Sequence, residues 1–218
     1  DENVVIDGTI ALPTAWKPWR DGIWKQTLSF KPHQLFCDDN LVHVARWPDA
    51  TFKNGSIWRM MEGMRSADGG WNKHKHKWDG KTRFGKLYDE GFSRPETPGF
   101  REGDSRYQVD PTIRFDRQSP PLADTKKDFT GCVAVLNIGH WKTWARSITQ
   151  HASGQDHFSY NTTGLVPEQI HQFSGYYILG LAALDRPNEW WFDADTKTMY
   201  YMPPTGIDPN IQNLRGRT

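Results

Sequence analysis

The apolar residues of this chain occur in short runs between turn residues, and this spacing predicts β-strands rather than helices. In the N-terminal part the runs cover residues 4–6, 22–28 and 41–47, and each is bounded on at least one side by Gly, Asp or Pro. Short β-branched or aromatic runs with such boundaries are typical of strands. Residues 38–40, Asp-Asp-Asn, lie just before the third run and predict a hairpin turn.

The C-terminal half carries the same signal, with one exception. Its strand-like runs cover residues 131–138, 141–144, 157–160, 189–193 and 198–202. The first is apolar at nearly every position, which predicts a strand buried on both faces. The last two flank residues 194–197 and predict a hairpin. Tyr177, Leu181 and Leu184 are spaced to share one helical face, so residues 176–184 predict one short helix.

Aromatic rings must supply much of the core. The hydrophobic share is 36% and the mean hydropathy is −0.76, yet aromatic residues reach 13% with eleven Trp. Buried rings remove a large apolar area from water. We therefore predict a mainly β fold, a barrel- or sandwich-like module with long loops and at most one short helix. The rings expected in its core, because they lie in strand patterns, are Trp24, Trp47, Trp141, Trp144, Trp190 and Tyr200.

Rings and cations also gather in a polar region, residues 51–122, where only short strands are predicted, at residues 85–88 and 112–115. Sugar rings pack their C–H faces on flat aromatic surfaces, while neighbouring polar groups bind hydroxyl or acid groups. This region therefore predicts a carbohydrate-binding surface. The alternatives are packing of these rings on another domain and stacking on RNA bases. The predicted carbohydrate-binding residues are Trp58, Trp71, Trp78, Tyr88, Arg59 and Arg83.

Charge and hydropathy exclude two classes of partner. Lys and Arg number 27 against 26 Asp and Glu, and the net charge of +1 gives no field that would attract nucleic acid. No window approaches the roughly 18 to 20 apolar residues that a membrane span requires, so no membrane partner is expected. Cys37 and Cys132 each lie in an apolar run and are interpreted as two buried thiols, with a disulfide between them as the alternative.

Motifs for catalysis or metal binding are weak. The sequence contains no Gly-x-Ser-x-Gly motif and no glycine-rich phosphate loop. The clustered carboxylates of Asp104, Asp110 and Asp116 are interpreted as turn and cap residues. His74 and His76 have a spacing that suits a metal on a strand, but interleaved lysines would repel a cation. We therefore predict no catalytic residue, metal or cofactor in this chain.

Three segments share an order and spacing with one known kind of module. They are residues 34–48, with Ala45-Arg46-Trp47-Pro48; residues 136–144; and residues 184–204, which begin Leu184-Asp185-Arg186-Pro187-Asn188-Glu189-Trp190 and end at Pro203-Pro204. Together they resemble the modules inserted in bacterial right-handed parallel β-helix proteins that act on carbohydrates. That family usually has Gly at the positions of Asn188 and Lys197. Both positions favour positive φ, which Asn tolerates and which costs Lys on the order of 1 kcal/mol.

The ends of the chain extend this resemblance. Residues 4–8 resemble the last strand of a β-helix coil, and residues 211–218 resemble the strand with which a β-helix resumes. The resemblance implies a strand stub at residues 1–10, an inserted β-module at 11–204, and a linker with the start of the resuming strand at 205–218. On this view the chain is a fragment of a longer protein. We therefore expect residues 4–8 and 211–216 to lie close together.

The resemblance also implies a function. It implies an accessory, non-catalytic module of a polysaccharide-active β-helix protein, which shapes or binds the glycan cleft. The alternatives are a purely structural module that covers the solenoid, and a part of a glycoside hydrolase or polysaccharide lyase that contributes active-site residues. The implied partners are a polysaccharide, acidic if the basic residues of the loop bind it, and the missing β-helix domain. The implied location is extracellular or periplasmic.

Overall fold

The computed structural model describes residues 7–49, 71–72, 77–78, 85–88, 121–139, 142–165 and 170–218. The fold is mainly β, with 45% strand, which confirms the predicted fold class. The chain divides into two compact units. Unit 1 comprises residues 1–46 and 179–218, and unit 2 comprises residues 47–178. No sequence pattern predicted this division, and each unit is described by itself below.

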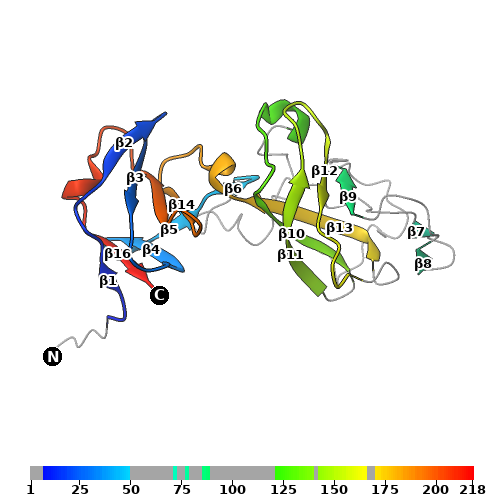
Figure 1. Cartoon of the computed structure of the whole chain (residues 1–218), viewed down its shortest axis with the longest axis horizontal. Helices are drawn as coiled ribbons and strands as arrows, with labels where there is room; N and C mark the ends of the chain where they lie inside the picture. Colours follow the sequence, from blue (N-terminus) through cyan, green and yellow to red (C-terminus); the bar gives the residue numbers. More distant parts are fainter. Residues whose placement is uncertain are drawn as a thin grey trace, which may run out of the picture. The chain divides into compact units, whose positions relative to one another are not determined.

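Unit 1 is built on one eight-stranded sheet with the order β1-β16-β4-β5-β14-β15-β3-β2 (Figure 1). Its neighbouring strands are antiparallel except for the parallel pair of β14 and β5. The predicted hairpins at residues 38–40 and 194–197 are both present, as β4–β5 and β14–β15. The strands are β1 (Ile10–Ala11), β2 (Lys17–Arg20), β3 (Ile23–Thr27), β4 (Gln34–Cys37), β5 (Asn40–Val44), β14 (Glu189–Asp193), β15 (Thr198–Met202) and β16 (Leu214–Arg217).

Two residues confirm the turn geometry that the resemblance predicted. Asn188 and Lys197 have φ angles of 64° and 52°, in the left-handed region where the family uses Gly. The carbonyl of Lys197 accepts a hydrogen bond of 2.9 Å from the amide of Leu28. This bond ties the β14–β15 turn to the end of β3, which helps to hold the strained backbone of Lys197.

The main core of unit 1 lies on one face of this sheet. Trp190 is 4% exposed and donates a hydrogen bond of 3.2 Å from Nε1 to the carbonyl of Val42. Half-buried Trp24 and Phe192 pack against the same cluster. The buried members of the core are Leu12, Trp16, Leu28, Leu35, Val42, Trp190, Met199, Tyr201 and Leu214.

The two ends of the described chain meet in unit 1. Ile10 of β1 pairs with Gly216 of β16, and β16 in turn pairs with β4. The guanidinium of Arg215 forms an ion pair with Asp7, and it also donates to the carbonyl of Asp38 at 2.6 Å. The expected proximity is therefore confirmed for Asp7 and Gly8 with residues 211–216, while residues 4–6 lie outside the described residues.

Unit 2 is built on a sheet with the order β6-β13-β10-β11-β12-β9, and a separate pair is formed by β7 and β8 (Figure 1). Its core is aromatic. Tyr176 lies 5.1 Å from Phe158 and 5.9 Å from Trp47, centroid to centroid, and Trp47 lies 6.1 Å from Phe129. The strands are β6 (Arg46–Trp47), β7 (Trp71–Asn72), β8 (Lys77–Trp78), β9 (Lys86–Tyr88), β10 (Val133–Gly139), β11 (Lys142–Gln150), β12 (His157–Tyr160) and β13 (Ile170–Leu179).

A buried histidine connects the segment before β10 to the end of β11 through hydrogen bonds. His151 is 2% exposed, and its Nδ1 accepts a hydrogen bond of 3.2 Å from the amide of Phe129. Its Nε2 lies 3.3 Å from the carbonyl of Gln155, so Nε2 carries the proton of the neutral ring. Thr130 Oγ1 accepts from the amide of His151 at 3.0 Å and donates to its carbonyl at 2.8 Å. Burial lowers the pKa of His151.

Two sequence predictions for the C-terminal half of the chain are wrong in part. The helix predicted over residues 176–184 is absent, because residues 176–179 continue β13 and only a short 3-10 turn, η5 (Leu181–Ala183), follows. Tyr176 and Ile178 are fully buried while Tyr177 is half-buried, which is the alternation of a strand. The strand predicted at residues 131–138 exists as β10. Val133 and Val135 are half-buried, however, so the second face of this strand is not fully buried.

The predicted core rings divide into three groups. Trp47, Trp190 and Tyr200 are buried, as predicted. Trp24 and Trp144 are half-buried, and Trp141 lies outside the described residues. Both cysteines are free thiols, which answers the question of a disulfide, but only Cys132 is buried, and Cys37 is half-buried.

The thiol of Cys37 is expected to react slowly with Ellman's reagent at neutral pH, although it is half-buried. Burial raises its pKa, and the neighbouring Asp38 carboxylate raises it further, so little of the reactive thiolate forms. We expect labelling in the Cys132→Ala variant, followed by absorbance, to be several-fold slower in buffer than in urea. Equal rates in the two solutions would contradict this expectation.

Candidate functional site

The residues predicted to bind carbohydrate are only partly described. Trp71 in β7 and Trp78 in β8 are directly opposite each other in the register of the antiparallel pair. Tyr88 ends β9 and pairs with His157 of β12. Trp58, Arg59 and Arg83 lie outside the described residues, as do the strand predicted at residues 112–115, the His74 and His76 pair, and Asp104, Asp110 and Asp116.

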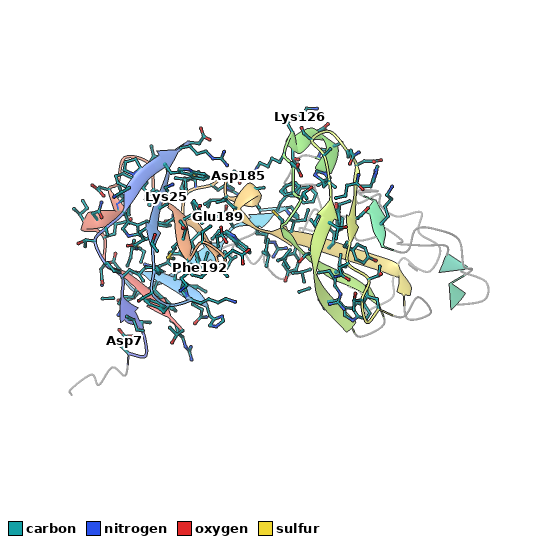
Figure 2. The ribbon with its side chains drawn as sticks, viewed as in Figure 1. Asp7, Lys25, Lys126, Asp185, Glu189 and Phe192 are labelled. Atoms are coloured by element: carbon teal, nitrogen blue, oxygen red, sulfur yellow. The ribbon has the colours of Figure 1, made fainter. Side chains whose placement is uncertain are left out.

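A second group of rings and cations lies in unit 1, on the face of the sheet opposite the main core. Trp191 pairs with Tyr200, Tyr200 pairs with Lys25, and Lys25 pairs with Lys17. Directly paired residues share one face of a sheet, so these four form a row across β14, β15, β3 and β2. Figure 2 labels Lys25 within this sheet. Trp191 and Lys25 are half-buried and Lys17 is exposed, whereas Tyr200 is 9% exposed.

Trp19 and Arg20 complete this face because β2 contains a bulge. The register between β2 and β3 shifts between Pro18 and Arg20, so Trp19 is an extra residue in β2. A bulge changes the direction in which side chains point, and here the consecutive residues Trp19 and Arg20 lie on the same face of the sheet. The two-residue turn that follows, Asp21 and Gly22, has positive φ at both positions, 50° and 78°. This is the geometry that Asp-Gly favours in a hairpin.

Trp19 is the centre of the resulting contacts. Its ring lies 4.8 Å from that of Tyr200, centroid to centroid, with the planes tilted by 53°. The Cζ atom of Arg20 lies 4.2 Å from the centroid of Trp19, and Nζ of Lys25 lies 5.7 Å from it. Both distances are within the range of cation–π attraction. We call this group the aromatic–cation face; its members are Trp19, Trp191, Tyr200, Lys17, Arg20 and Lys25.

Two acidic residues of β14, Glu189 and Asp193, share the same side of the sheet. Glu189 is 4% exposed, and the carboxylate of Asp193 serves the β14–β15 turn. It accepts hydrogen bonds from the amide of Asp195 at 3.0 Å and from Thr196 Oγ1 at 2.8 Å. These hydrogen bonds lower the pKa of Asp193, and the bond from the Thr196 side chain has the largest effect. The pKa of Tyr200 is raised, first by burial and then by Asp193, while Arg20 opposes the shift. The phenol of Tyr200 therefore stays protonated and can donate a hydrogen bond.

Sequence reasoning missed this face because it treated Tyr200 as core and did not single out Trp19. Tyr200 is indeed buried, within a small cluster on this side of the sheet against which Trp19 and Trp191 pack. A signal was present: Trp19-Arg20-Asp21-Gly22 precedes an alternating run and fits a type I′ hairpin. No sequence pattern comparable to the Asp-Gly turn predicts the bulge at Trp19.

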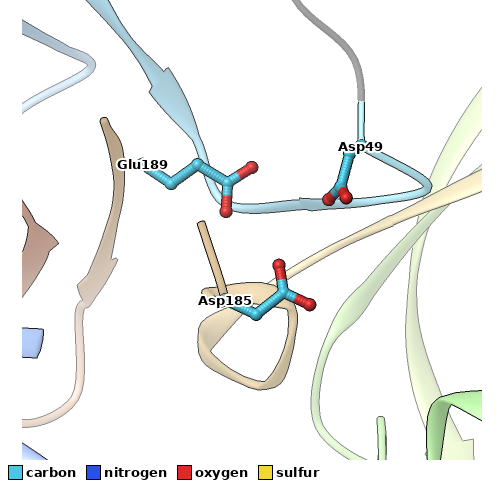
Figure 3. A group of neighbouring side chains, drawn as sticks. All are labelled: Asp49, Asp185 and Glu189. Carbon is cyan, nitrogen blue, oxygen red and sulfur yellow. The ribbon is translucent and has the colours of Figure 1, made fainter. Parts of the chain in front are cut away.

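Two carboxylates also lie close together in unit 1. Asp185, in the segment after η5, is exposed, whereas Glu189, at the start of β14, is 4% exposed. Carboxylate oxygens of the two lie within 4.8 Å of each other (Figure 3). Asp49, also drawn in Figure 3, belongs to unit 2. Both Asp185 and Glu189 take part in further interactions, and we assign this pair no catalytic step.

No helix among the described residues has the length and apolar character of a membrane span. No family model matches the chain, and no curated protein matches it. A solved structure described as a glycoside hydrolase is similar to it, with a TM-score of 0.52 and 15% identity over 99% of this chain. This chain spans 32% of that protein. At this identity the likeness concerns the fold: a region of a protein described as a glycoside hydrolase is folded as this chain is.

Proposed function

We propose that this chain is an accessory, non-catalytic β-module of a larger polysaccharide-active protein, and that it binds glycan. The observation that carries the proposal is the extent of the likeness: it covers 99% of this chain and 32% of a protein described as a glycoside hydrolase. A module of this size would contribute a surface to such a protein and leave the remaining two thirds to other parts. The aromatic–cation face supplies rings and polar groups of the kind that sugars contact.

The parent protein in this proposal is a bacterial parallel β-helix protein of the extracellular space or periplasm, a glycoside hydrolase or polysaccharide lyase. Its support is the resemblance of residues 34–48, 136–144 and 184–204, together with the pairing of β1 with β16. An inserted module leaves and rejoins its host at neighbouring points, so adjacent ends suit an insertion. In the host the module would form one wall of the glycan cleft.

Affinity gel electrophoresis of the chain tests the binding role. We expect its migration to be retarded by at least one polysaccharide in a panel of neutral and acidic polymers, relative to gels without polymer. The affinity should be weak, because one wall supplies part of the contacts while the cost of immobilising the sugar remains. A reference protein of similar mass and charge controls for sieving by the polymer. Unchanged migration on every polymer would reject the binding role and favour a module that is only structural.

A further inference from the structure

The cations of the aromatic–cation face are not ion-paired with the residues that the structure describes. Lys17, Arg20 and Lys25 form no ion pair with any of them. Lys17 and Lys25 are direct cross-strand neighbours, an arrangement that is destabilising for like charges. The Asp193 carboxylate is engaged in its own turn. An anion bound between these cations would remove their repulsion.

Arg20 is held in a position that suits an anionic ligand. Its Cζ atom lies over the ring of Trp19, 4.2 Å from the centroid. A guanidinium on an aromatic face can still present its planar set of N–H donors to another partner. Arg20 is exposed and makes no side-chain hydrogen bond with a described residue. The in-plane donors can therefore bind two oxygens of one acid group.

We propose that the aromatic–cation face binds the acid groups of an anionic polysaccharide, either uronate carboxylates or sulfate esters. This proposal rests on the proposed function and names its ligand class. Arg20 and Lys25 bind the acid groups, and the half-buried ring of Trp191 packs against a sugar ring at the other end of the row. The row crosses four strands, or three spacings of a sheet, about 14 Å. That length accommodates a short oligosaccharide.

The test is affinity gel electrophoresis of the full chain at about 0.1 M salt with dextran, dextran sulfate, polygalacturonate and polyuridylate. The two variants Arg20→Gln and Lys25→Gln each remove one charge from the face. Arg217→Gln is the matched control, since Arg217 is exposed on β16, near the opposite edge of the same sheet. Thermal melts of all variants verify that the fold is kept.

We expect retardation by dextran sulfate or polygalacturonate, and the stronger of the two identifies sulfate or carboxylate as the acid group. The apparent Kd should rise about tenfold in Arg20→Gln, as for the loss of a hydrogen bond to a charged group, and several-fold in Lys25→Gln. Arg217→Gln should behave as the wild type. Arg20→Lys should be intermediate, because it keeps the charge and loses the planar fork. Binding should weaken between about 0.1 M and 1 M salt.

Four results would overturn this proposal. Equal losses in Arg20→Gln and Arg217→Gln would mean that the face is not the site. Equal retardation by polyuridylate, lost in Arg20→Gln, would mean a nucleic acid or general polyanion site. Retardation by neutral polymers alone, with no change in Arg20→Gln, would reject the anionic ligand. The proposed function would stand in that case. Absence of retardation on every polymer would reject the proposed function as well.

Discussion

Replacing Trp190 with alanine is expected to lower the free energy of unfolding by about 3–5 kcal/mol, the usual range for loss of a large buried ring. The side chain is 4% exposed and belongs to the main core of unit 1. Its Nε1 donates to the carbonyl of Val42, so the substitution also removes this buried hydrogen bond. Urea unfolding followed by circular dichroism measures the loss in the transition of unit 1.

Two further variants make this measurement specific. Trp190→Phe keeps most of the ring and removes the hydrogen bond, and it should cost less than the alanine variant. Ile211→Ala truncates an apolar side chain that is 82% exposed, and it should stay within about 0.5 kcal/mol of the wild type. A loss below about 1 kcal/mol for Trp190→Ala would place this ring outside the core.

The stability of unit 2 is expected to fall as the pH decreases below about 6.5, the ordinary pKa of histidine. Burial lowers the pKa of His151 in the folded chain, while the Gln155 carbonyl and Asp128 oppose the shift and His157 adds to it. The unfolded chain therefore binds a proton more readily than the folded one. The contribution of His151 is fully present above the unfolded pKa and is lost as the pH falls toward the folded pKa.

The physical cause of this loss is the acceptor role of Nδ1. A proton on Nδ1 would face the amide of Phe129, which now donates to it. His151→Asn keeps an acceptor near that amide and does not titrate, so its unfolding free energy should vary less with pH between 7 and 5 than that of the wild type. We expect His151→Ala to cost about 1–3 kcal/mol at pH 7.5, because the amide of Phe129 loses its acceptor. If the unfolding free energies of the wild type and His151→Asn, measured by urea melts, vary equally with pH, His151 is not the cause of the pH dependence.

The sequence predicted those parts of the fold that depend on local signals. The β4–β5 hairpin follows from Asp38-Asp39-Asn40, and the β14–β15 hairpin follows from two aromatic strands around a four-residue turn. Positive φ at Lys197 was predicted by resemblance although Lys is a poor residue for it. These features require only neighbours in sequence.

Features that depend on long-range pairing were not predicted. Residues 176–179 fit a helical face as well as a strand by spacing alone, and only the pairing of β13 within its sheet decides between them. The aromatic–cation face assembles residues 17–25 with residues 191 and 200, which meet only because β15 pairs with β3. The carbohydrate-binding residues proposed in the loop region remain a prediction, because most of them lie outside the described residues.

The division of the chain also has a consequence for its synthesis. Unit 2 is one continuous segment, whereas unit 1 needs residues from both ends of the chain. The ribosome makes β3 and β5 early, but their neighbours β15 and β14 are made only after all of unit 2. Until then β3 and β5 present unpaired edges that can associate with other chains. Unit 2 can thus finish folding first, and slow translation of the last forty residues (179–218) would lengthen the period in which nascent chains are prone to aggregate.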